Sequence, residues 1–157
     1  MNLVADVRRF PQSRRWPQFN QDQLQAHLNA AGIGYLWLPA LGGRRHLRTD
    51  APTYAGWEQP GFRAYAAHMS SPEFQSALTG FIASVGDKRP AVICAEGLWW
   101  QCHRRLIADQ LLVLGHTVRH IMPDGLLVEH VLTPFAVVRD GRLTYPAPVQ
   151  RALFGAR

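Results

Sequence analysis

The stretch Ala91-Val-Ile-Cys94-Ala-Glu96-Gly97-Leu-Trp-Trp-Gln-Cys102-His103-Arg104-Arg105 holds both cysteines of the chain, and apolar side chains recur at helical spacing after it as far as Gly115. This pattern predicts a strand over residues 90–95, a loop, and a helix over residues 102–114. A helix start is a positive end, where free N–H groups favour anions and lower the pKa of a nearby thiol. The chain therefore places two thiols, a carboxylate and an imidazole at a site suited to anion binding or thiol chemistry.

Strands and helices alternate on both sides of this stretch. The residue pattern predicts strands over 2–8, 33–38 and 117–121, and helices over 21–31, 62–69 and 72–85. Asn20 and Ser71 are the expected N-caps of the first and last of these helices, and Gly32 is expected to end the first. Such alternation indicates an α/β fold with a mostly parallel sheet flanked by helices. Residues 135–145, with Asp140-Gly141 at their centre, predict an additional C-terminal β-hairpin.

Length and composition favour one domain. The 157 residues are 47% hydrophobic and 18% charged, so we expect a single domain over 1–157, with a core over about 2–130 and the hairpin added over about 134–146. The segment 39–61, rich in Gly, Pro and Arg, is expected to be a functional or mobile loop. The chain has no 18-residue apolar span and begins with a strand-like Leu3-Val4-Ala5, so we expect a cytoplasmic protein with reduced thiols and no contact with a membrane.

The net charge of +6 comes almost wholly from arginine, since Lys88 is the only lysine. Arginine binds phosphate and carboxylate through two parallel hydrogen bonds, which lysine does not do. The carboxyl ends of strands in an open parallel sheet form its ligand edge. The predicted partner is accordingly a nucleic acid or a phosphorylated small molecule, with ordinary surface charge as the alternative. The predicted anion-binding residues, at strand ends or in the loops beyond them, are Arg8, Arg14, Arg44, Arg45 and Arg104.

Four residues are candidates for catalysis. Cys102, at a helix start, is a candidate nucleophile, and His103 or Glu96 is a candidate proton carrier. Glu96 is alternatively the ion-pair partner of an arginine. Cys94 is either a second reactive thiol or a small core residue. The spacing of these residues lacks the two close pairs of a closed zinc site, so we expect no metal. The predicted supporting residues are Asp6, Tyr35 and His120.

No phosphate-binding loop or dinucleotide fingerprint is present, which predicts that no common nucleotide cofactor is bound. The short motif Leu41-Gly42-Gly43 is interpreted as a tight turn that aims Arg44 and Arg45.

Several motifs together resemble a bacterial family known as domain of unknown function 488. They are Asp6-Val-Arg8 with Pro11 and Ser13, Gly32-Ile-x-Tyr35, Leu41-Gly42-Gly43, Cys94-Ala-Glu96 with Cys102-His103-Arg104, and His120-Ile121, and they span residues 3–130. The resemblance implies a small α/β domain with these residues near one site, and no assigned activity. A weaker likeness of layout links the chain to rhodanese-type sulfurtransferases. There the cysteine lies in a tight loop, whereas here about seven residues separate Cys94 from the helix start and Glu96 would repel an anion.

These observations leave three functions open. The first is a cleft that binds a phosphorylated or nucleic-acid-like ligand, with thiol chemistry by Cys102 or Cys94. The second is a non-enzymatic module that binds nucleic acid or protein and has inert cysteines. The third is a redox or metal sensor, which requires the two sulfurs to lie close together. The sequence names neither a substrate nor an oligomeric state.

Overall fold

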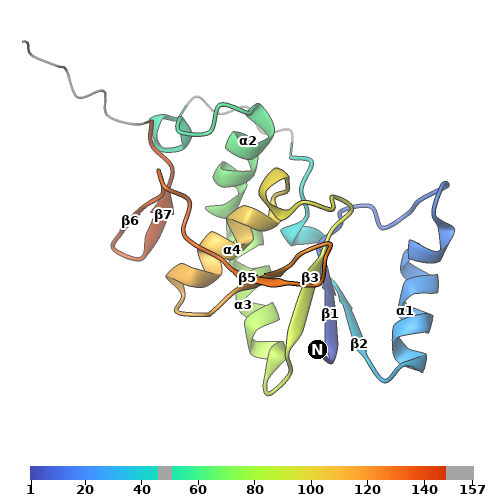
Figure 1. Cartoon of the computed structure of the whole chain (residues 1–157). Coiled ribbons are helices and arrows are strands. Elements are labelled where there is room, and N and C mark those ends of the chain that lie inside the picture. The colour runs from blue at the N-terminus through green and yellow to red at the C-terminus, as the bar shows by residue number, and fades with distance from the viewer. Residues whose placement is uncertain (46–50, 148–157) are drawn as a thin grey trace, which may run out of the picture.

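Three short parallel strands form the centre of the molecule (Figure 1), in a computed structural model that describes residues 1–45 and 51–147. The sheet order is β2-β1-β3, with β1 (Leu3–Asp6) between β2 (Gly34–Trp37) and β3 (Pro90–Ile93). Every residue of β1 is buried, as expected for a central parallel strand. The last residue of β1, Asp6, lies opposite Trp37 and Ile93, so the carboxyl ends of all three strands meet at one edge.

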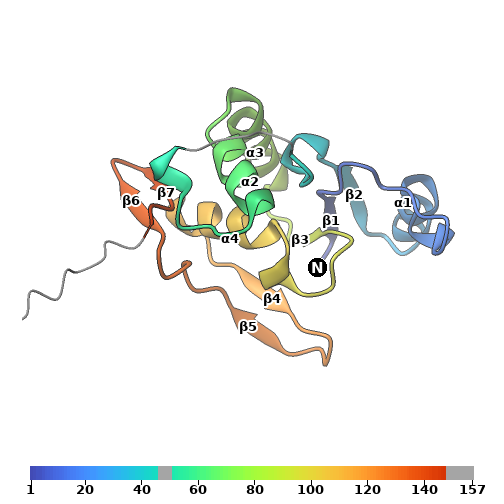
Figure 2. The same ribbon diagram turned by 90° about the horizontal axis from the view of Figure 1, so that it is seen from above.

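Four α-helices surround this sheet: α1 (Gln21–Ala30), α2 (Pro60–Met69), α3 (Pro72–Val85) and α4 (Arg104–Val113). Figures 1 and 2 show α1 beyond β2 at one end, while α2, α3 and α4 gather on the side of β1 and β3. The core lies on that side, where Val7 after β1 belongs to one apolar cluster with Tyr65, Phe74 and Leu106. Four single turns of 3-10 helix connect these elements: η1 (Pro17–Phe19), η2 (Pro39–Leu41), η3 (Pro52–Tyr54) and η4 (Trp99–Gln101).

Two antiparallel ribbons complete the described chain. The predicted hairpin is confirmed as β6 (Val137–Arg139) and β7 (Arg142–Thr144), with Asp140 and Gly141 both at positive φ, as a two-residue primed turn requires. The strand expected over 117–121 exists as β4 (Arg119–Ile121), but it pairs with β5 (Leu127–Glu129) instead of extending the parallel sheet. This ribbon lies beside α4, away from α2 and α3 (Figure 2).

The turn between β4 and β5 explains why β4 does not join the main sheet. Gly125, at φ 84°, donates its N–H to the carbonyl oxygen of Met122, and the N–H of Met122 bonds to Leu126. The chain therefore reverses at once, and β4 pairs with the strand that follows it. The sequence analysis did not predict β5.

The observed helix boundaries differ from the predicted ones at the cap of α1 and at the start of α4. Ser71 caps α3 as predicted, since its Oγ accepts the N–H of Phe74, whereas the side chain of Asn20 accepts the N–H of Ser13 and not one from α1. The helix predicted to begin at Cys102 begins at Arg104, because Cys102 has extended backbone angles. The segment 39–61 includes η2, η3 and the start of α2, and its residues 46–50 lie outside the described chain.

None of the helices in the described part of the chain is long and apolar enough to span a lipid bilayer.

Candidate functional site

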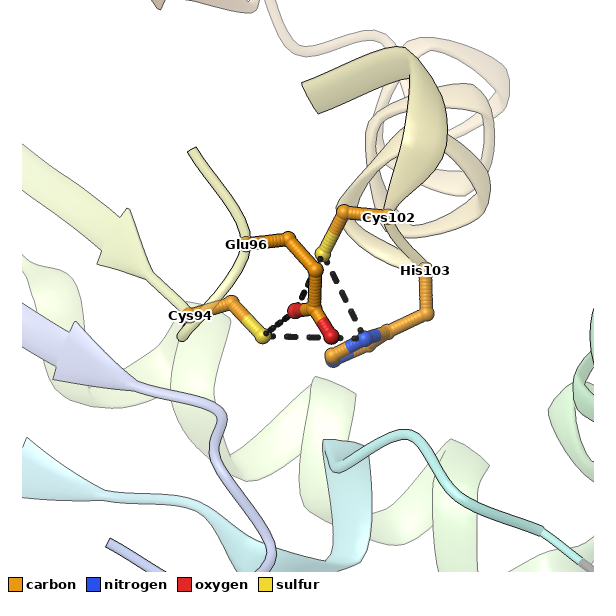
Figure 3. Close-up of side chains that lie close together, drawn as sticks. All are labelled: Cys94, Glu96, Cys102 and His103. Atoms are coloured by element: carbon orange, nitrogen blue, oxygen red, sulfur yellow. Dashed lines mark hydrogen bonds between the residues drawn. The ribbon is translucent and has the colours of Figure 1, made fainter. Parts of the chain in front are cut away.

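The loop after β3 and the residues before α4 bring four side chains together at the carboxyl-terminal edge of the parallel sheet (Figure 3). Cys94 and Glu96 come from the loop, and Cys102 and His103 from the approach to the helix. The sulfurs, a carboxylate oxygen and a ring nitrogen all lie within 4.8 Å of one another. We call these four residues the thiol centre. The structure therefore gathers all four predicted catalytic residues.

Distances within the thiol centre are short on every side. Glu96 Oε2 lies 2.7 Å from Cys94 Sγ and 3.4 Å from Cys102 Sγ. His103 Nδ1 lies 3.9 Å from Cys94 Sγ and 3.5 Å from Cys102 Sγ. Cys102 is buried, Cys94 is half-buried and Glu96 is exposed, so the group opens to solvent on the carboxylate side.

Arg104 holds the two halves of the thiol centre together. Its Nη2 donates to the carbonyl oxygens of Glu96, at 2.5 Å, and Gly97, at 3.3 Å. These bonds tie the loop after β3 to the first residue of α4. The guanidinium that the sequence placed among the anion-binding groups thus has backbone partners within its own chain, and its position makes it a positioning residue for Glu96.

The two thiols differ in their electrostatic surroundings. The side chain of Cys94 is the largest cause that lowers the pKa of Cys102, to about 3. The side chain of His103 and the backbone N–H of Arg104 lower it further, while burial acts in the opposite direction. The pKa of Cys94 is raised, first by its hydrogen bond to Cys102 and then by burial. The surroundings therefore favour the thiolate form of Cys102 over that of Cys94.

The imidazole of His103 is fixed between aromatic and backbone neighbours. The ring of Tyr65 lies 4.9 Å away between centroids, and Tyr65 donates its hydroxyl to the carbonyl oxygen of Leu41. A Cβ built on Gly43 would stand 2.7 Å from His103 Nδ1, so the Leu41-Gly42-Gly43 turn makes room for the ring. The sequence analysis missed this role of Gly43, since no spacing rule links residues so far apart. His103 Nε2 is buried and has no partner among the described residues.

A second polar group occupies the end of β1. Asp6, fully buried, accepts hydrogen bonds from the guanidinium and backbone N–H of Arg8, and a 2.7 Å bond from the hydroxyl of Tyr35. The hydrogen bond to Asp6 is the largest cause that raises the pKa of Arg8. Arg8 also donates to the carbonyl oxygen of Phe19. Asp6, Arg8 and Tyr35 therefore satisfy one another, and Arg8 is engaged within the fold.

The remaining predicted anion-binding arginines divide into two kinds. Arg45 donates to the carbonyl oxygens of Pro39, Ala40 and Gly42, so it stabilises the turn that includes η2. Arg44 and Arg14 are exposed, and Arg44 takes a positive φ of 57°. Only Arg14 and Arg44 of the five thus present exposed side chains.

His120 lies in another cluster, on a strand outside the parallel sheet. On β4 its Nε2 lies 2.9 Å from Nδ1 of His130, whose Nε2 lies 2.9 Å from the buried carboxylate of Asp109. The indole of Trp99 stacks on His120 with centroids 3.8 Å apart. Burial is the largest cause that lowers the pKa of His120 to about 4, and His130 and Arg104 add to it. The sequence analysis singled out neither His130 nor Asp109 as a candidate site residue.

Comparison with known proteins adds one finding. The family model described as "Domain of unknown function DUF488" matches residues 1–111, a segment that includes the parallel sheet and the whole thiol centre. The match ends before β4. His120, which belongs to one of the motifs named in the sequence analysis, therefore lies outside the matched segment. Neither the curated proteins nor the solved structures provide a significant match. Because the match covers more than half of the chain, this protein belongs to the DUF488 family, the domain of unknown function 488.

Proposed function

We propose that this protein binds a phosphate-bearing, nucleic-acid-like ligand through the segment 9–19 and the neighbouring loop at Arg44. The observation that carries the proposal is the pairing of exposed arginines with exposed aromatic rings. The guanidinium of Arg9 lies 5.7 Å from the ring centroid of Phe10, and that of Arg15 lies 5.4 Å from that of Trp16. Phe10 is 66% exposed and Trp16 is 53% exposed, so both rings are free to stack. We call residues 9–19 the arginine-aromatic segment.

The chemistry of this segment fits an unpaired strand of nucleic acid. Proteins that bind single strands combine cationic groups along the phosphates with aromatic rings on which bases stack. Phe19 and Trp37, also exposed, add two rings close to the same region, since Phe19 lies in the segment and Trp37 donates its indole N–H to Arg8. A hollow of about 480 Å³ beside Arg14 is lined by Gln12, Ser13, Arg14, Pro17 and Asn20. Its amide and hydroxyl groups suit hydrogen bonding to a base or a sugar.

Contacts connect the arginine-aromatic segment with the thiol centre. Arg9 Nη1 donates to the carbonyl oxygen of Arg44, and a Cβ on Gly42 would lie 3.0 Å from Arg9. The next residue, Gly43, contacts the ring of His103. A strand bound along the segment would therefore extend toward the thiol centre. This continuity supports a ligand-binding edge that includes both features.

Salt-dependent binding of defined oligonucleotides tests this proposal. We expect a fluorescent oligothymidylate to bind more tightly than a duplex of equal length, with affinity that falls as salt rises in proportion to the phosphates contacted. Trp16→Ala is expected to weaken binding about tenfold or more, through lost stacking, and Arg14→Ala to lower the salt slope. Arg119→Ala and Arg142→Ala, exposed on the two ribbons, are the matched controls. Equal losses in the controls, or no binding at low salt, would refute the proposal.

Thiol chemistry is a second candidate, favoured by the contacts of Cys102. Its sulfur lies at the start of α4 and within 3.5 Å of both an imidazole nitrogen and a carboxylate oxygen. In this function Cys102 is the nucleophile, Cys94 holds the proton beside it, and Glu96 or His103 transfers the proton. A cytoplasmic, reducing location is part of this proposal, because oxidation would remove the nucleophile.

Alkylation of the metal-free protein tests the second candidate. We expect iodoacetamide to label Cys102 first at neutral pH, and we expect Arg104→Ala to slow labelling because it releases the loop that carries Glu96. Arg89→Ala, an exposed arginine just before β3, is the control. The thiol-chemistry proposal would be refuted if Cys102 reacted no faster than a free thiol in a peptide. It would also be refuted if Arg104→Ala left the labelling rate unchanged.

A further inference from the structure

We propose that the thiol centre is a metal site, in which Cys94, Glu96, Cys102 and His103 bind a single zinc ion. The inference rests on the geometry of the four donor atoms and does not depend on the nucleic-acid proposal. Two sulfurs, one imidazole nitrogen and one carboxylate oxygen form the kind of donor set that zinc accepts. Thiolates and imidazole also exclude the hard cations magnesium and calcium, which bind oxygen ligands.

Three separations between the donor atoms are close to the edges of a tetrahedron around zinc. Zinc bonds of about 2.3 Å to sulfur and about 2.0 Å to nitrogen or oxygen place neighbouring ligands about 3.5 Å apart. The distances between Glu96 Oε2 and Cys102 Sγ, 3.4 Å, and between His103 Nδ1 and Cys102 Sγ, 3.5 Å, agree with this value, and His103 Nδ1 to Cys94 Sγ is 3.9 Å. The 2.7 Å between Glu96 Oε2 and Cys94 Sγ is shorter, and Glu96 is exposed and able to draw back. All four donor atoms lie within 4.8 Å of one another.

Both halves of the donor set are held in place by the fold. Cys94 and Glu96 follow β3, whose last residue is paired with β1, and Cys102 and His103 precede α4. Arg104 links the halves through its bonds to the carbonyl oxygens of Glu96 and Gly97. The four ligands thus form two close pairs in sequence, Cys-x-Glu and Cys-His. The sequence analysis considered these residues as donors and expected no metal, because it judged their spacing to lack the two close pairs of a standard closed zinc site.

Charge balance supports a dication at this place. Two thiolates and a carboxylate carry three negative charges, so a bound Zn²⁺ would reduce the net charge of the site to −1. The guanidinium of Arg104 and the N–H groups that begin α4 lie next to this remaining negative charge. The imidazole would ligate through Nδ1, because this nitrogen faces both sulfurs while the other ring nitrogen is buried. A closed set of four protein ligands is typical of a structural zinc site, which here would lock the loop after β3 onto α4.

Metal titration under reducing conditions tests the inference. The full chain, stripped with a chelator, is titrated with Co²⁺ alone and then with Zn²⁺ in competition with a chromophoric chelator. We expect one equivalent to bind, with thiolate-to-cobalt charge-transfer bands and the ligand-field bands of a tetrahedral ion that zinc then abolishes. Zinc is also expected to protect both cysteines from iodoacetamide.

Variants identify the ligands. Cys94→Ser, Glu96→Gln and His103→Gln are each expected to weaken zinc binding by more than about 100-fold, since a missing ligand costs more than the loss of an outer-shell contact. Gly43→Ala removes no ligand and is expected to weaken binding about 10–100-fold by displacing His103. The controls are His116→Gln and Glu129→Gln, both exposed and outside the thiol centre.

Several results would overturn the inference: no stoichiometric binding by the reduced wild-type chain, a cobalt spectrum without thiolate bands, or unchanged affinity in Cys94→Ser and Glu96→Gln. Cys94→Ser and Glu96→Gln alter residues that are not fully buried, so both variants are expected to fold, which circular dichroism can check. Fast alkylation of Cys102 that zinc does not slow would also overturn it, in favour of thiol chemistry. Oligonucleotide binding is measured separately, so failure of one proposal leaves the other intact.

Discussion

The backbone of Gly43 lies against the imidazole of His103, so that a Cβ at position 43 would be 2.7 Å from Nδ1, 3.2 Å from Cε1 and 3.2 Å from Cγ. No real Cβ atom tolerates the first of these distances, and the ring cannot retreat freely because Tyr65 stands on another side. One glycine, 60 residues away from His103 in the chain, therefore sets the direction in which Nδ1 faces the two sulfurs.

Gly43→Ala is expected to lower the free energy of unfolding by about 1–3 kcal/mol, the usual cost of forcing atoms into a packed site. The strain falls on His103, because position 43 itself has no positive φ that would penalise alanine. Urea unfolding followed by circular dichroism measures the effect. Gly97→Ala, where a Cβ meets nothing within 4 Å, is the control. Equal stability of the two variants would show that the ring is not confined.

Asp6→Asn is expected to destabilise the protein by about 3–5 kcal/mol, because it leaves the guanidinium of Arg8, only 11% exposed, without its carboxylate. Tyr35→Phe is expected to cost about 1.5–3 kcal/mol, the range for one hydrogen bond to a charged group. Denaturant unfolding of both variants checks these values. Similar small losses in both would indicate that the ion pair contributes little to the fold.

Stability is expected to fall by about 1 kcal/mol between pH 7 and pH 5.5 through His120. The folded protein holds the pKa of His120 at about 4, below its ordinary value of 6.5, so the unfolded chain binds more protons in this range and acid favours unfolding. The groups that face His120 are His130 and Arg104, and Trp99 covers its ring.

Urea titrations at both pH values measure this dependence. His120→Gln is expected to reduce it, while His116→Gln, at an exposed position, is expected to leave it unchanged. His68 also has a lowered pKa, caused first by burial, and it contributes equally to both variants. The same pH dependence in the two variants would contradict the prediction.

Asp109→Ala is expected to cost about 3–5 kcal/mol, since the fully buried carboxylate accepts bonds from the N–H of Thr133 and the hydroxyl of Tyr145 and contacts His130. This one side chain of α4 connects the end of the β4-β5 ribbon with the residue after β7. Tyr145→Phe, which removes only one bond, is expected to cost about 1.5–3 kcal/mol. Thermal unfolding of both variants is the measurement, and a loss for Asp109→Ala no greater than that for Tyr145→Phe would contradict this role.

Local chemistry explains why much of the fold could be predicted. The central strand is an apolar run ending in Asp6, Ser71 and Pro72 begin α3 as a cap and a first-turn proline do, and Asp140-Gly141 forms its turn with nearest neighbours only. Each of these signals acts within a few residues. The strand–loop–helix around Cys94 and Cys102 was predicted for the same reason.

Contacts between residues that are distant in sequence explain the features that could not be predicted. The residue sequence by itself determined the alternating strands and helices and the presence of thiols, carboxylate and imidazole in one stretch. Only the tertiary structure decided that Arg8 and Arg45 bond within the fold, that β4 pairs with β5, and that Gly43 orients His103. Hydrogen bonds and close packing depend on which atoms meet in space, and residue spacing carries no information about such contacts across 60 positions of chain.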